Sequence, residues 1–113
     1  MNMRSNALAF TIGLAFLGFF SGCAEDHRWR AAMNSGNNAM RSGDYTHAEE
    51  SFVAARKEAE VLDPQGKRLA ETLSQLGEVN RELGRYPRAE ALFQEALAIR
   101  ERALGETHRD VEK

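Results

Sequence analysis

Cysteine and proline are scarce in this chain: its 113 residues include one cysteine and two prolines. A single cysteine can form no internal disulfide, so packing must provide the stability of the fold. The three histidines are scattered, without a His-x-x-x-His spacing, and the sequence therefore predicts no metal site. It also has no Gly-rich phosphate loop and no serine in a nucleophile-elbow context, so we predict neither a cofactor nor an enzymatic activity.

The first part of the chain is apolar and ends at the only cysteine. Residues 7–20 form a run of 14 residues, and Arg4 is the only charge that precedes it. Spanning a bilayer takes about 20 apolar residues, so this run is short for a permanent helix and is typical of a secretory signal. The small residues Ser21-Gly22 then precede Cys23. This order resembles a bacterial lipoprotein signal, with Phe20 where that signal usually has leucine.

The resemblance implies that residues 1–22 are a cleaved signal peptide and that Cys23 carries the lipid, for example palmitate. Residues 23–28 are then the lipidated N-terminus and a short tether, and 29–113 form the folded domain. Several acyl chains on Cys23 would anchor the protein stably to a membrane. Ala24 follows the cysteine where an inner-membrane retention signal has aspartate, so we expect the outer membrane of the bacterial cell envelope, facing the periplasm. The alternative is an uncleaved signal anchor.

The mature part of the chain is weakly acidic. It contains all 17 acidic residues and 14 of the 15 Lys and Arg, which gives a net charge of −3. A nucleic-acid-binding protein usually shows a clustered basic patch, and none is seen here. We therefore expect no nucleic-acid partner.

The mature sequence repeats itself at a spacing of 41 residues. Residues 43–49, GDYTHAE, correspond to residues 84–90, GRYPRAE, and the register continues downstream and upstream. Self-similarity at this spacing predicts stacked supersecondary units. The repeated residues that we assign to packing are Gly43, Tyr45, Ala48, Phe52 and Ala55 in the first copy, and Gly77, Gly84, Tyr86, Ala89, Phe93 and Ala96 in the second.

The hydrophobic period is that of helices throughout the mature part. We predict an all-α fold with four helices at about 25–41, 44–62, 64–83 and 86–104. Gly43 and Gly84 are expected to end helices because glycine adopts positive φ easily, and Asp44 is expected to cap the helix that follows it. Residues 63–64, Asp-Pro, predict an N-cap followed by proline at the first helical position. Asn80 is the one polar interruption of an apolar stripe in the third helix.

This pattern resembles the tetratricopeptide repeat, a helix–turn–helix unit with small residues and aromatics at fixed places. The second unit, about 64–105, is similar to the 42-residue variant found in kinesin light chain. The first unit covers about 29–63, and residues 106–113 resemble the truncated start of a third.

The resemblance implies a protein–protein interaction module, an adaptor or scaffold that binds a peptide in a groove lined by the first helix of each unit. Position by position, the groove candidates are Arg30, Met33, Asn37 and Arg41 in the first unit, and Glu71, Ser74, Glu78 and Arg81 in the second. Their mixed charges indicate a polar peptide whose identity is unknown. The alternative is that these side chains form a solvated helix face.

Two further hypotheses follow from the small number of units. Repeat stacks generally need three or more units and a polar cap, so the stripe of Leu92, Ala96, Ile99 and Ala103 is expected to stay exposed. The protein could then be a structural element that assembles as a homo-oligomer by stacking through its last repeat. Alternatively, the chain is a fragment of a longer repeat protein.

Overall fold

The computed structural model describes the backbone of residues 26–112 and the side chains of residues 26–105. The described part consists of a first helix at residues 26–42, α2 (Tyr45–Leu62), α3 (Lys67–Glu82) and α4 (Tyr86–Glu112), and contains no strand. The all-α prediction is thus confirmed. The predicted signal peptide and Cys23 lie outside the described residues. Residues 26–28, which we assigned to a tether, already belong to the first helix.

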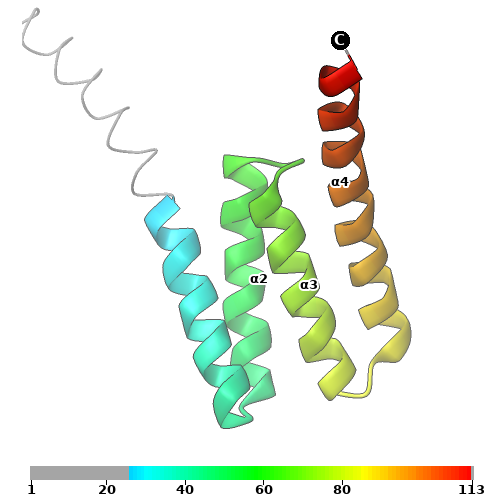
Figure 1. Ribbon diagram of the computed structural model, residues 1–113. Helices are drawn as coiled ribbons and strands as arrows, with labels where there is room; N and C mark the ends of the chain where they lie inside the picture. The colour runs from blue at the N-terminus through cyan, green and yellow to red at the C-terminus, as the bar shows by residue number, and fades with distance from the viewer. Residues whose placement is uncertain (1–25, 113) are drawn as a thin grey trace, which may run out of the picture.

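The helices stand side by side as two hairpins (Figure 1). The first helix and α2 form the first unit, and α3 and α4 form the second. Because α3 packs against both α2 and α4, it is the central element of the stack. The two units are thus joined through α3.

Glycine ends the first helix of each unit. Gly43 and Gly84 have φ angles of 78° and 77°, which confirms their predicted role, because L side chains rarely adopt such angles. The following helices begin at Tyr45 and Tyr86. The backbone N–H of His47 donates to Asp44 Oδ1 over 3.2 Å, so Asp44 caps α2 as the sequence predicts.

The predicted start of the third helix is wrong. Asp63 is instead the C-cap of α2, since its N–H donates to the carbonyl of Ala59. Residues 63–66 form a turn closed by a 3.1 Å bond from the Gly66 N–H to the Asp63 carbonyl, and α3 begins only at Lys67. A Cβ on Gly66 would lie 1.6 Å from an Asp63 carboxylate oxygen, so a larger residue at this position would require the exposed Asp63 side chain to rotate away.

The last helix is longer than its predicted range of 86–104. It continues to Glu112 because Gly105 has no positive φ and no proline follows it. Residues 106–112, which resemble the start of a third unit, extend α4 in this structure.

The core repeats from one unit to the next. Ala48, Phe52 and Ala55 of α2 are fully buried. A Cβ built on Gly36 would lie 2.4 Å from the Phe52 ring, and one on Gly77 would lie 2.7 Å from the Phe93 ring. In both units a phenylalanine therefore packs directly on the backbone of the preceding helix. The two phenylalanines are 41 residues apart in the sequence, as are the two glycines.

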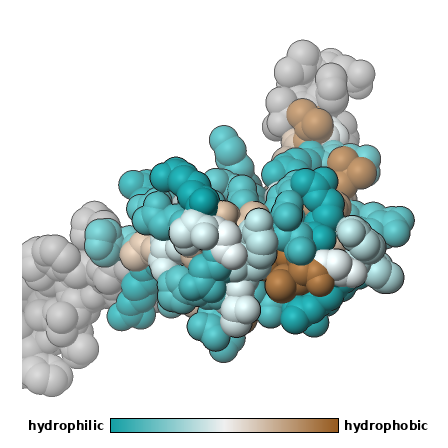
Figure 2. Space-filling model, turned by 90° about the horizontal axis from the view of Figure 1, so that it is seen from below, coloured by the Kyte–Doolittle hydropathy of each residue, from teal (hydrophilic) through white to brown (hydrophobic). Residues whose placement is uncertain are grey.

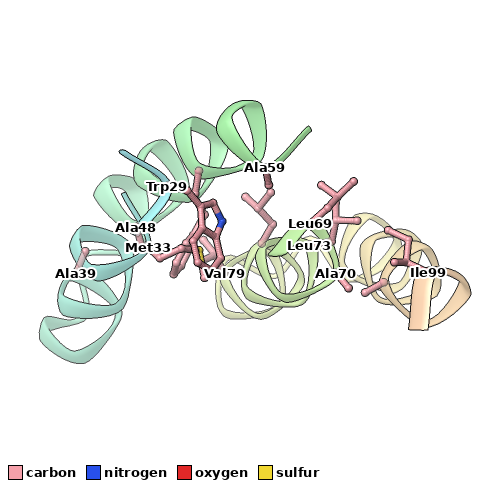
Figure 3. Close-up of a cluster of buried hydrophobic side chains, with 14 residues drawn as sticks. Trp29, Met33, Ala39, Ala48, Ala59, Leu69, Ala70, Leu73, Val79 and Ile99 are labelled. Carbon is pink, nitrogen blue, oxygen red and sulfur yellow. The ribbon is translucent and has the colours of Figure 1, made fainter. Parts of the chain in front are cut away.

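A second set of contacts joins the first helix to α3. Trp29 Nε1 donates to Thr72 Oγ1 over 2.9 Å, and Arg68 lies over the Trp29 ring at 5.6 Å from its centre. Arg68 also forms a 2.8 Å ion pair with Asp26. Figure 3 shows Trp29 and Met33 among the first helix, α2 and α3, while Ile99 extends the same cluster to α4.

The stripe that we expected to be exposed on α4 is mostly covered. Ala96 and Ile99 are buried in the cluster shared with α3, and Leu92 packs against it. Only Ala103 is exposed. The large apolar side chains that the described part of α4 exposes lie on a neighbouring stripe, with Tyr86 at 65%, Leu97 at 54% and Leu104 at 60%.

Candidate functional site

A groove runs between α2 and α4, and α3 forms its floor. One hollow in it has a volume of about 330 Å³ and is lined by Glu49, Val53, Arg56, Leu76, Asn80, Arg88, Ala91, Leu92 and Glu95. A second hollow of about 370 Å³ continues toward the turn at residues 63–66, with Leu69 and Leu73 in its floor. We call these two hollows together the α2–α4 groove. Its leucine floor suits an apolar side chain of a ligand.

Asn80 is the unusual residue of this floor. It is 1% exposed, and its Nδ2 donates to the carbonyl of Leu76 over 2.7 Å. Its Oδ1 is buried and has no hydrogen-bond partner within the described part of the chain. A buried acceptor without a partner is unfavourable by about 1–3 kcal/mol, and a ligand with an N–H or O–H donor would remove that penalty.

Charged side chains line the rims of the α2–α4 groove. Arg56 of α2 lies 3.6 Å from Glu95 of α4, and so bridges the groove where its two hollows meet. Arg85 donates to Glu49 over 2.6 Å at one end. Since these pairs are partly exposed, each stabilises the fold by at most about 1 kcal/mol, and a charged ligand could replace one of them.

In the first unit, the structure buries one of the residues that we predicted to line an open groove. Met33 is 4% exposed, and its Sδ lies 3.6 Å from Thr72 Oγ1, so its assignment to an open groove is corrected. The reason is that the first helix packs directly on α3 at this point. Arg30 and Arg41 are exposed, and Asn37 is half-buried.

In the second unit the predicted groove residues lie on the surface of α3. Glu71 is exposed, and Ser74 donates to the carbonyl of Ala70 over 3.1 Å. Glu78 forms an ion pair with Arg81. Of the eight predicted groove residues, only Arg81 lines one of the three hollows described for this structure.

That third hollow, about 300 Å³ in volume, lies at the open end of the stack. It is lined by Arg81 of α3 and by Tyr86, Ala89, Glu90, Phe93, Gln94 and Leu97 of α4. Figure 2 shows a mostly hydrophilic surface on which a few hydrophobic side chains form separate brown patches.

Sequence reasoning missed the α2–α4 groove as a site. The interruption of the α3 stripe by Asn80 was a usable signal, because a polar residue at a buried helical position needs a partner. Val53 and Arg88 carried no such signal, since neither can be distinguished from an ordinary surface residue in the sequence.

Two classes of site are not found in the described part of the chain. No helix among those residues is long and apolar enough to span a membrane. The same residues hold no group of three or more His, Cys, Asp or Glu side chains placed to bind a metal ion.

Two helical hairpins that repeat at 41 residues, with a phenylalanine packed on glycine in each, define a helical-repeat protein. Residues 30–110 match the tetratricopeptide repeat family, and the chain belongs to this family. Repeats of this family are protein–protein interaction modules. No curated protein and no solved structure matches the chain.

Proposed function

We propose that the protein is a lipid-anchored adaptor of the bacterial cell envelope, which binds a peptide segment of another protein. The family match over residues 30–110 supports the binding role. The sequence around Cys23 supports the anchor, and through Ala24 the outer membrane.

The observation that carries the binding role is the unpartnered Asn80 Oδ1 in the floor of the α2–α4 groove. A peptide offers both complements of this floor: a backbone or side-chain donor for Asn80, and an apolar side chain for Leu69, Leu73 and Leu76. The rims present acids and arginines together, so a peptide of mixed charge fits better than one of a single sign.

The anchor is tested by Cys23→Ser in the full chain. Cells are fed a clickable palmitate analogue, and the protein is followed through membrane fractionation. The wild-type chain should carry the label and sediment with the outer membrane, whereas the variant should carry no label and keep its signal peptide. Equal labelling of the two proteins would contradict lipidation at Cys23.

The binding site is tested by placing a photo-cross-linking amino acid at Val53, which is 40% exposed at the groove rim. The full chain should cross-link to a defined partner in cells. Arg88→Glu and Asn80→Leu should weaken that cross-link about tenfold, since each removes a complement of the peptide.

Charge reversal at Arg41 and Glu78 is the matched control, because both residues lie outside the α2–α4 groove. These variants should leave the cross-link unchanged. If Arg41→Glu or Glu78→Lys abolished it and Arg88→Glu did not, the peptide would occupy the surface of the first helices. A cross-link that none of the variants alters would contradict a groove-based function.

A further inference from the structure

One face of α4 carries a regular stripe that the other described helices leave largely open, although the Phe93 ring also packs on Gly77 of α3. Its residues follow one another at alternating steps of four and three, so they lie along a single side of the helix. They are Tyr86, Glu90, Phe93, Leu97, Arg100 and Leu104. We call this set the α4 stripe. It is apolar at four of six positions, and three of those side chains are more than half exposed.

The first unit shows what this fold does with such a surface. The residues 41 positions earlier include Tyr45, which packs against the core, and Phe52, which is fully buried. Phe52 is thus buried and Tyr45 partly buried in a stack where α3 packs on α2. The α4 stripe has no such neighbour among the described residues, so its apolar side chains favour contact with another helix.

The first helix, at the other end of the stack, does not suit this role in a head-to-tail assembly of copies. The positions of α3 that pack inward include Leu69, Leu76 and Val79. Their counterparts 41 residues earlier are Arg28, Ser35 and Asn38, which make the first helix polar at this end. In a head-to-tail stack, the first helix of a second copy would pack on α4 as α3 packs on α2. It would place polar residues against the α4 stripe, at positions where α3 has leucine and valine.

The α4 stripe is, however, complementary to itself. If two α4 helices run antiparallel with a two-fold axis passing between Phe93 and Leu97, every position of the stripe meets a suitable partner. Phe93 faces Leu97 of the second copy, and Tyr86 faces Leu104. Glu90 faces Arg100, and by symmetry this ion pair forms twice. A closed two-fold contact of this kind repeats each interaction on both sides.

The two charges of the α4 stripe support this pairing. In the first unit Glu49 binds Arg85 over 2.6 Å, whereas its counterpart Glu90 accepts only a 3.4 Å bond from Gln94. Arg100 replaces the fully buried Ala59 of the first unit and has no ion-pair partner among the described residues. Each copy thus holds one acid and one arginine at positions that the two-fold axis exchanges.

We propose that the protein forms a two-fold dimer in which the α4 stripes of two copies pack antiparallel. This contact lies on α4 away from the α2–α4 groove, so it is independent of the peptide-binding role. The dimer would therefore present two such grooves.

The test uses charge-reversal variants of the full chain. Each protein is purified in a detergent matched in density to the solvent, under reducing conditions that keep the cysteine from forming a disulfide. Sedimentation equilibrium across a wide concentration range should show a monomer–dimer equilibrium. Glu90→Arg sets two arginines against each other at each contact, and Arg100→Glu does the same with two acids. Each variant should raise the dissociation constant about tenfold or more.

Mixing the two variants gives a result that a folding defect cannot imitate. Glu90→Arg and Arg100→Glu together form a heterodimer in which both contacts are again opposite in charge, and the mixture should recover the mass of the wild-type dimer. The matched control is Glu101→Arg, an exposed position of α4 outside the stripe, which should dimerise normally.

Circular dichroism of each variant should show an unchanged helix content. A chain that stays monomeric at all concentrations would overturn the proposal. So would a dimer, a longer stack or a complex with another protein that neither charge reversal weakens, because the α4 stripe would then not be the contact.

Discussion

Phe52 and Phe93 each pack on a glycine of the preceding helix, and these two pairs let the two helices of each unit approach closely. The 41-residue register made both pairs predictable, since a large and a small residue recur together in each copy. Met33 shows the limit of such reasoning. Its place on a helix is predictable, but its burial depends on the helix that packs beside it, which a pattern within one helix does not show.

Gly36→Ala should destabilise the protein by about 1–3 kcal/mol, because the new Cβ would overlap the Phe52 ring and that fully buried ring has no room to move. The measurement is urea unfolding followed by far-ultraviolet circular dichroism. Gly105→Ala is the control: a Cβ there meets nothing within 4 Å. It should be neutral or slightly stabilising, as alanine favours a helix. Equal effects of the two changes would contradict the proposed packing.

Asn80→Leu should keep or raise the free energy of unfolding, by up to about 1–2 kcal/mol. It removes a buried acceptor that has no partner, next to a hollow with room for the new side chain. Thermal unfolding measures the change. Leu76→Asn, which buries a new polar group in the same floor, should instead lower the melting temperature markedly. A large loss of stability in Asn80→Leu would show that the Asn80 amide is needed for folding.

At the scale of elements, the helix ends that rest on a local conformational rule were predictable. Gly43 and Gly84 need positive φ, and Asp44 has the acceptor that a first turn needs. The start of α3 was not predictable in this way. Residues 63–64 fit an N-cap with proline after it, but Asp63 remains bonded to the end of α2, a competing contact that the sequence does not reveal.

Asp44→Ala should therefore cost about 1 kcal/mol of stability, since the His47 N–H at the start of α2 would lose its acceptor. Asp44→Asn should cost far less, because an asparagine oxygen accepts the same bond. Chemical denaturation of the three proteins gives the comparison. Equal losses in both variants would mean that the carboxylate charge matters more than the cap.

At the scale of the whole molecule, the two-unit stack was predictable from the repeat, whereas the faces that it leaves open were not. The sequence suggested that Leu92, Ala96 and Ile99 stay exposed, but α3 covers that side of α4. Two adjacent apolar stripes on one helix look alike in sequence, and the choice between them depends on the angle at which α3 arrives. The α2–α4 groove was missed for the same reason, since its residues come from three helices.

The bond from Trp29 to Thr72 joins the two units across 43 residues of sequence. A double-mutant cycle with Trp29→Phe and Thr72→Val should give a coupling energy of about 1 kcal/mol, because the two side chains meet in a buried hydrogen bond. Urea unfolding of the four proteins provides the values. The control is a second cycle that pairs Trp29→Phe with Thr46→Val, at an exposed position on α2. This pair should show no coupling energy. Strictly additive effects of the first pair would contradict the bond.

The chain is already helical at Asp26, three residues after Cys23. Three extended residues span at most about 10 Å. Under the proposed lipidation, the linker between the lipid and the helical stack would therefore be very short. Such a protein would lie against its bilayer rather than reach out into the compartment. Its partners would have to be membrane neighbours or come to the lipid surface, and encounters would follow diffusion in two dimensions. Lengthening this junction with a flexible insert would enlarge the volume in which the protein can meet a partner.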